Sequence, residues 1–274
     1  MARNGRRNEP RGEVRGERKG WSPAANRGGH GARKPATGPV ASDWLWGWHV
    51  VTSALANPAR GAPRRLVASE DRARQLAALT PAKIETLNAA DIAKLLPAGA
   101  VHQGVALKPE PLESSSLEEI GDPASGVLIM LDQVTDPQNV GAVFRSAAAF
   151  GARGVIVQDR HTPHFGGVIA KAAAGALDAV PHARVVNLAR ALEELEELGW
   201  RAVGLTGDAP ETLEAVLDGS PTVLVLGSEG EGLRRLVSEH CDVLARIPMP
   251  GGSESLNVSA AAAVALYEAT RPGR

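Results

Sequence analysis

The stretch IPMPGGSESLNVSAAAAVALYEAT, residues 247–270, says most about how this 274-residue chain folds. It begins with a loop punctuated by Pro and Gly, which cannot continue as helix or strand. Ser255, Asn257 and Ser259 then stand where residues that cap helices are favoured, ahead of an Ala-rich run with almost no polar atoms. A polar, glycine-rich loop that leads into a small, apolar and buried helix can build a ligand pocket from backbone groups.

Upstream of this stretch, apolar runs of strand length alternate with helical segments from residue 126 onward. The runs are GVLIMLDQV, GVIVQD, ARVV, RAVGLT, TVLVLG and VLARIPM. Six such runs between helices predict a parallel sheet with helices on both faces. Because ligands of open parallel sheets bind beyond the carboxyl ends of the strands, we expect a site among the loops that follow these runs.

Residues 41–108 are interpreted as a smaller mixed α/β domain. It opens with Trp44, Trp46 and Trp48, which could stack on bases. A cluster of aromatic residues at the start of a domain is, however, more often part of its core. The segment 109–124 combines Pro, Ser and acidic residues without periodicity, so we predict a linker there and a second domain over 125–272.

Charge is unevenly distributed along the chain. Residues 1–40 hold ten Lys and Arg against three Glu, whereas the remainder holds twenty against twenty-eight acidic residues. The basic segment has too few apolar residues to order itself, so we predict a disordered tail that either contacts nucleic acid or acts as a solubilising leader. A single cysteine, Cys241, excludes a disulfide framework and fits a reducing cytoplasm. No apolar run is long enough to span a membrane.

Two more loops after predicted strands carry polar side chains. In DQVTDPQN, residues 132–139, Asn139 could cap a helix beginning at Val140, and Arg145 lies six residues further on. Alone, Arg145 is better explained as a solvated charge. The loop GSEGEG, residues 227–232, lacks the glycine spacing of a dinucleotide-binding or phosphate-binding loop, and its acids suit a cationic or neutral ligand. Alone, Glu229 is better explained as a carboxylate at a helix N-terminus.

In order and spacing, the three loops resemble the motifs of the SpoU (TrmH-type) RNA ribose 2′-O-methyltransferases of the SPOUT class. The matching stretches are LDQVTDPQNVGAVFRSAAAFG, with the pattern D-P-x-N-x-G-x-x-x-R, then LVLGSEGEGL and IPMPGGSESLNVSAAAAVALYE. HQGVAL, residues 102–107, also resembles the bacterial branch that methylates a guanosine ribose of 23S rRNA. The resemblance covers residues 44–270. It implies that the first domain binds substrate RNA and that the second contains a trefoil knot.

The resemblance further implies S-adenosylmethionine as cofactor, no metal, and a cytoplasmic homodimer. Five residues fall on the family's active-site positions: Asn139, Arg145, Glu229, Ser255 and Asn257. The cofactor-binding positions are Leu226, Gly227, Glu229, Ile247, Pro248, Met249, Ser255, Leu256 and Asn257. Two alternatives to 23S rRNA methylation stay open, namely tRNA ribose methylation and a catalytically silent RNA-binding protein of the same fold.

Arg145 occupies the position that the resemblance assigns to the acceptor of the 2′-OH proton. That role is physically awkward, because a guanidinium keeps its own proton up to about pH 12. Either extreme desolvation or a target phosphate removes the proton from Arg145, or the side chain stays cationic and stabilises the developing alkoxide. We favour the cationic role.

Overall fold

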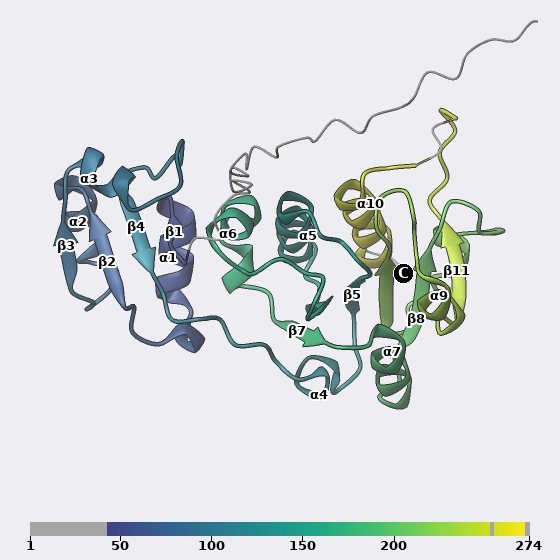
Figure 1. Ribbon diagram of the computed structural model, residues 1–274. Helices are drawn as coiled ribbons and strands as arrows, with labels where there is room; N and C mark the ends of the chain where they lie inside the picture. Colours follow the sequence, from purple (N-terminus) through teal and green to yellow (C-terminus); the bar gives the residue numbers. More distant parts are fainter. Residues whose placement is uncertain (1–42, 253–254, 272–274) are drawn as a thin grey trace, which may run out of the picture. The chain divides into compact units, whose positions relative to one another are not determined.

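Two sheets organise the residues that the computed structural model describes, which are 43–252 and 255–271 (Figure 1). The first sheet has four strands and mixed pairing, and the second has seven strands that are all parallel. This mixed α/β architecture with a parallel sheet confirms the predicted fold class. The predicted basic tail, residues 1–40, lies outside the described residues.

The first sheet has the strand order β1-β4-β2-β3. Its strands are β1 (Leu45–Trp46), β2 (Arg65–Ala68), β3 (Ile84–Thr86) and β4 (Val105–Lys108), and its helices are α1 (Trp48–Ala56), α2 (Glu70–Leu76), α3 (Ala89–Lys94) and the short 3-10 helix η1 (Pro58–Arg60). Trp46 is buried in its core, while Trp44 and Trp48 are only half-buried. The guanidinium of Arg72 lies 4.5 Å from the centre of the Trp48 ring. The tryptophan cluster is therefore only partly core.

The second sheet has the strand order β7-β6-β5-β10-β8-β11-β9. Its strands are β5 (Val127–Leu131), β6 (Gly154–Gln158), β7 (His182–Val185), β8 (Arg201–Leu205), β9 (Glu211–Thr212), β10 (Thr222–Leu226) and β11 (Val243–Arg246). All six predicted strands are present. The seventh, β9, is a two-residue strand beside β11 and is too short to show periodicity in the sequence.

Helices cover both faces of the second sheet, as the alternating pattern predicts. Val127, Ile129 and Leu131 of β5 face one core, and Leu128 and Met130 face the other. The first core contains α5 (Pro137–Ala149), α6 (Gly167–Ala173), α8 (Leu213–Val216), α10 (Val258–Thr270) and the 3-10 helix η2 (Ala176–Asp178). The second contains α4 (Leu117–Gly121), α7 (Leu188–Glu197) and α9 (Arg235–Glu239). Figure 1 shows α5, α6 and α10 on one side of the strands and α4 and α7 on the other.

Helix α10 is the Ala-rich run of the opening stretch. Asn257 caps it, because its side-chain oxygen accepts hydrogen bonds from the backbone N–H groups of Ser259, at 3.0 Å, and Ala260, at 3.4 Å. One side of α10 is buried and packs on α5, whereas Val264 and Tyr267 are 42% and 57% exposed. None of the described helices is long and apolar enough to cross a membrane.

Helix α5 begins three residues earlier than the sequence analysis predicts. Pro137 stands at its first position, and the side chain of Asp136 accepts a hydrogen bond from Gln138 N at 3.1 Å. Proline suits this position because its missing N–H would have had no partner inside the helix. The prediction that Asn139 caps a helix beginning at Val140 is therefore wrong. Asn139 lies within the first turn, where its side chain is not needed as a cap.

Part of the segment 109–124 is regular structure. Ser116 and Glu119 form a capping box at the start of α4, and Ser115 N donates to His182 O of the edge strand β7 at 2.8 Å. A buried ion pair joins Arg60 of η1 to Asp178 of η2. The division of the chain into domains at 109–124 stays a prediction.

Candidate active site

A pocket of about 640 Å³ lies at the carboxyl ends of three neighbouring strands, β8, β10 and β11. The rule for open parallel sheets predicts this location. Each of the three strands contributes the loop that follows it, and the start of α10 closes one side. The lining residues are Leu205, Thr206, Gly207, Asp208, residues 226–232, Ile247, Met249, residues 255–258 and Ala261.

The pocket gathers nearly all of the positions that the resemblance assigns to the cofactor. The exception is Pro248, which is exposed and does not line it. The loop 205–208 after β8 also contributes, and the sequence analysis missed it. The signal was available, because this loop follows a predicted parallel strand just as the other two do.

Three polar side chains from distant parts of the chain meet at the rim of this pocket. Asn139 Nδ2 donates to Glu229 Oε1 at 3.0 Å, and Asn257 Nδ2 donates to Asn139 Oδ1 at 3.0 Å. Asn257 Nδ2 also donates to Glu229 Oε1. We call Asn139, Glu229 and Asn257 the amide–carboxylate triad. It joins the three sequence motifs, so their predicted convergence is confirmed.

Glu229 owes its position to a tightly folded loop, residues 227–233. Ser228 and Gly232 pair across this loop, with Gly232 N donating to Ser228 O at 3.0 Å. A side chain on Gly227 would lie 2.1 Å from the carbonyl carbon of Gly232, so only glycine fits there. Helix α9 begins only at Arg235, so the explanation of Glu229 as a carboxylate at a helix N-terminus is wrong.

Arg145 and Ser255 are placed differently from the triad. Arg145 is exposed on α5, and among the described residues its guanidinium has no hydrogen-bond or ion-pair partner. Ser255 lines the pocket beside Leu256. A cation on the same helix as Asn139, without a carboxylate to neutralise it, is available to contact an anionic substrate.

The pocket favours a cationic ligand that is partly apolar. Among the described residues, its lining includes the carboxylates of Asp208, Glu229 and Glu231 and no Lys or Arg. Apolar side chains such as Leu226 and Ile247 can cover a flat ring, and the glycines allow close approach to the backbone. Within residues 43–252 and 255–271, no group of three His, Cys, Asp or Glu side chains is placed to hold a metal ion.

The sequence signature described as the SpoU rRNA Methylase family matches residues 126–267, which include all strands of the second sheet and the pocket. The chain belongs to the SpoU rRNA methylase family. A SpoU relative from Pseudomonas aeruginosa, "23S rRNA (guanosine-2′-O-)-methyltransferase RlmB", is 45% identical over 64% of this chain and 72% of its own length. A relative of the same name from Xylella fastidiosa is 47% identical over 63% of this chain and 72% of its own length.

Solved SpoU structures share the fold as well. The AdoMet-bound rRNA methyltransferase from Sinorhizobium meliloti superposes with a TM-score of 0.72 at 26% identity, over 84% of this chain and 87% of that one. The similarity extends beyond residues 126–267, because the superposition covers more of the chain than the family signature does.

Proposed function

We propose that this protein is an S-adenosylmethionine-dependent RNA methyltransferase that methylates the ribose 2′-OH of a guanosine in 23S rRNA. The observation that carries the proposal is the amide–carboxylate triad, which brings three SpoU motifs together at the rim of one pocket. The relatives from Pseudomonas aeruginosa and Xylella fastidiosa, at 45% and 47% identity, carry this activity in their names.

The pocket residues fit S-adenosylmethionine. When bound, this cofactor supplies a methyl group on a positively charged sulfur. Asp208, Glu229 and Glu231 place negative charge around the pocket, which suits a sulfonium and opposes a polyphosphate. We assign Leu226, Gly227, Ile247, Met249 and Leu256 to the adenosine moiety, largely through backbone groups.

The polar residues at the rim then act on the 2′-OH. In the triad, Glu229 accepts two amide hydrogen bonds and so fixes the direction of Asn139 and Asn257. Arg145 remains cationic, orients the phosphate beside the target ribose, and stabilises negative charge that develops on the 2′-oxygen as the 2′-OH proton passes to water. Ser255 completes the wall of the pocket that faces the ribose.

Two further parts of the proposal concern assembly and substrate. The protein forms a homodimer through the outer side of α10, where Val264 and Tyr267 are exposed apolar side chains.

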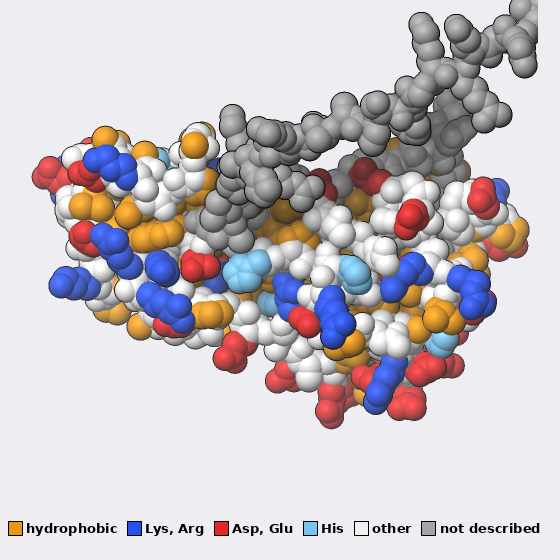
Figure 2. All heavy atoms as spheres, in the orientation of Figure 1, with side chains coloured by type: hydrophobic (Ala, Val, Ile, Leu, Met, Phe, Trp, Pro, Cys, Tyr) orange, Lys and Arg blue, Asp and Glu red, His pale blue; other side chains and the backbone are white. Residues whose placement is uncertain are grey.

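The first sheet binds the rRNA. On the face seen in Figure 2, Lys and Arg side chains gather over this sheet, which suits a phosphate backbone. A cytoplasmic location follows from an rRNA substrate.

Mapping of the product tests the proposal. Purified protein is incubated with S-adenosylmethionine labelled in the methyl group and with unmodified 23S rRNA or bulk tRNA. Resistance of one phosphodiester to alkaline hydrolysis then locates a 2′-O-methyl group. Methylation of one guanosine in 23S rRNA is expected. Methylation of tRNA alone would replace the substrate, and no transfer to either RNA would favour the catalytically silent alternative.

Arg145 gives the sharpest test of the chemistry. Arg145→Ala should lower the rate of methyl transfer by two orders of magnitude or more, as expected for a lost charge at the transition state. Cofactor binding, measured by calorimetry, should be unchanged because Arg145 does not line the pocket. Arg145→Lys should keep part of the rate, because a point charge remains. A near-normal rate for Arg145→Ala would overturn the assignment.

A further inference from the structure

Asp132 is the most deeply buried carboxylate near the pocket, and no sequence motif assigns it a role. It follows β5 directly and is 0% exposed. Its two carboxylate oxygens accept hydrogen bonds from one residue: Arg234 N donates to Oδ2 at 2.9 Å, and Arg234 Nε donates to Oδ1 at 2.7 Å. A buried carboxylate is costly without such partners, so this arrangement holds Arg234 firmly.

The backbone of Asp132 holds a second point on the same segment. Asp132 N donates to Leu226 O at 2.8 Å. Leu226 is the last residue of β10, and Arg234 immediately precedes α9. One buried residue therefore binds both ends of the loop 227–233, whose tip carries Glu229.

The loop is short and internally paired, so fixing its ends also fixes its tip. Ser228 and Gly232 bridge across it, and Gly227 contacts Gly232 too closely to allow a side chain. Asp132 itself has no hydrogen bond with Glu229 or Asn139 among the described residues. Any influence on the triad must pass through the loop.

We propose that Asp132 is a positioning residue for methyl transfer, which fixes both ends of the loop 227–233 so that Glu229 meets Asn139 and Asn257. This inference rests on the proposed function. A carboxylate at this position suits the task because it binds a backbone N–H and a guanidinium N–H at once, with one oxygen for each.

A double-mutant cycle separates positioning from general support of the fold. Asp132→Asn, Glu229→Gln and the double variant are compared for kcat, for KM of RNA and for cofactor affinity. Asp132→Asn is nearly isosteric and should lower kcat about tenfold, which is what the loss of one hydrogen bond to a charged group amounts to. In the Glu229→Gln background the same change should cost less than about twofold, because both substitutions remove the same alignment.

Asp242→Asn is the matched control. Asp242 also accepts a backbone N–H, from Ala202 at 2.7 Å, but it precedes β11 at the opposite ends of the strands. Its substitution should leave kcat unchanged. If Asp132→Asn does not fold, Arg234→Gln serves instead, because it removes the guanidinium bond and keeps the backbone bond to Oδ2. Its loss of kcat should be smaller than that of Asp132→Asn, and it should again be reduced in the Glu229→Gln background.

The outcomes are distinct from those of the proposed function. If the unaltered protein methylates neither RNA, the proposed function fails. If it is active but the kcat effects of Asp132→Asn and Glu229→Gln multiply, Asp132 supports the fold without positioning Glu229 and this inference is overturned. A wild-type kcat for Asp132→Asn would overturn it as well.

Discussion

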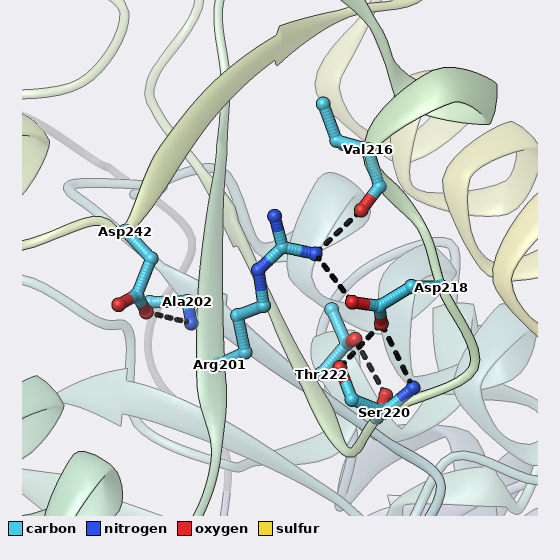
Figure 3. A network of polar contacts seen from close by, with 7 residues as sticks. All are labelled: Arg201, Ala202, Val216, Asp218, Ser220, Thr222 and Asp242. Atoms are coloured by element: carbon cyan, nitrogen blue, oxygen red, sulfur yellow. Dashed lines mark hydrogen bonds and ion pairs between the residues drawn. The ribbon is translucent and has the colours of Figure 1, made fainter.

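Two polar networks lie at opposite ends of the same parallel strands. At the carboxyl ends, the triad joins Asn139 and Glu229, which are 90 residues apart, and Asn139 and Asn257, which are 118 apart. At the amino ends, Figure 3 shows a network around Arg201 and Asp218, which are 17 residues apart. There Arg201 Nη1 donates to Asp218 Oδ2 at 3.3 Å, and Ser220 N donates to Asp218 Oδ1 at 3.0 Å.

Both networks contain a carboxylate that accepts hydrogen bonds, but they differ in what they connect. Three of the six amino-end bonds span only two residues and close a turn, such as the bond from Thr222 Oγ1 to Ser220 O at 2.9 Å, and the other three hold the start of β8 to neighbouring segments. The carboxyl-end contacts join three segments that are distant in sequence, namely the first turn of α5, the loop 227–233 and the start of α10, at the rim of a pocket of about 640 Å³. A polar network that joins distant segments at a pocket therefore indicates a site, whereas one that closes a local turn indicates structure. Substitutions should separate the two roles.

The largest contrast should come from removing the carboxylate at each end. Glu229→Ala should lower the methylation rate on the order of a hundredfold, because Asn139 and Asn257 lose the acceptor that aligns them. The melting temperature should barely change, since Glu229 is exposed. Methyl transfer to 23S rRNA and thermal unfolding are measured on the same preparations.

Asp218→Ala is the counterpart at the amino ends. It should leave the rate unchanged and lower the melting temperature slightly, because it removes the acceptor for Ser220 and Arg201. Equal loss of activity from Asp218→Ala and Glu229→Ala would show that the two networks do not differ in function.

Most of the fold follows from patterns that the sequence displays directly. Six strands, the flanking helices and the Asn257 cap are local features with recognisable periodicity or residue preference. Strand β9 is not predicted, because two residues are too few to show an alternating pattern. The start of α5 was misplaced because Asp136 and Asn139 are both good caps, and only the position of Pro137 decides between them.

The site is predicted less completely for a physical reason. The three motifs can be placed at strand ends from the sequence, but their contacts depend on how loops fold. The role of Asp132 depends on a hydrogen bond to Arg234 that spans 102 residues. Pro137 marks Asp136 as a helix cap, but no local signal in the sequence marks Asp132 as the partner of Arg234.

Asn257 takes part in the triad and also caps helix α10, so its variants test the role in the site and the role in local structure at one residue. Its side-chain oxygen caps α10 while its amide nitrogen donates to Asn139 and Glu229. Asn257→Ala should therefore lower the free energy of unfolding by about 1 kcal/mol and also lower the methylation rate. Asn257→Ser should restore the cap and the stability in urea unfolding but leave the rate low, because serine cannot supply the amide donors. Recovery of the rate in Asn257→Ser would show that only the cap matters.

The smallest expected effect concerns acid stability at the amino ends. Hydrogen bonds from the hydroxyl and backbone N–H of Ser220, with a further contribution from the charge of Arg201, lower the pKa of Asp218 from its ordinary value. A carboxyl group whose pKa is lowered by folding stabilises the protein above its unfolded pKa, and this contribution is lost as pH falls through the folded pKa. Asp218→Asn should therefore melt slightly below the unaltered protein at neutral pH, and the difference should disappear as pH falls below about 4. Because Asp218 is exposed, the difference should be small.

Melting curves across this pH range provide the measurement, and an unchanged methylation rate at neutral pH is the control. A difference in melting temperature that grows toward acid pH would contradict the sign of the pKa shift. A lower methylation rate for Asp218→Asn would show that the turn at the amino ends affects the pocket.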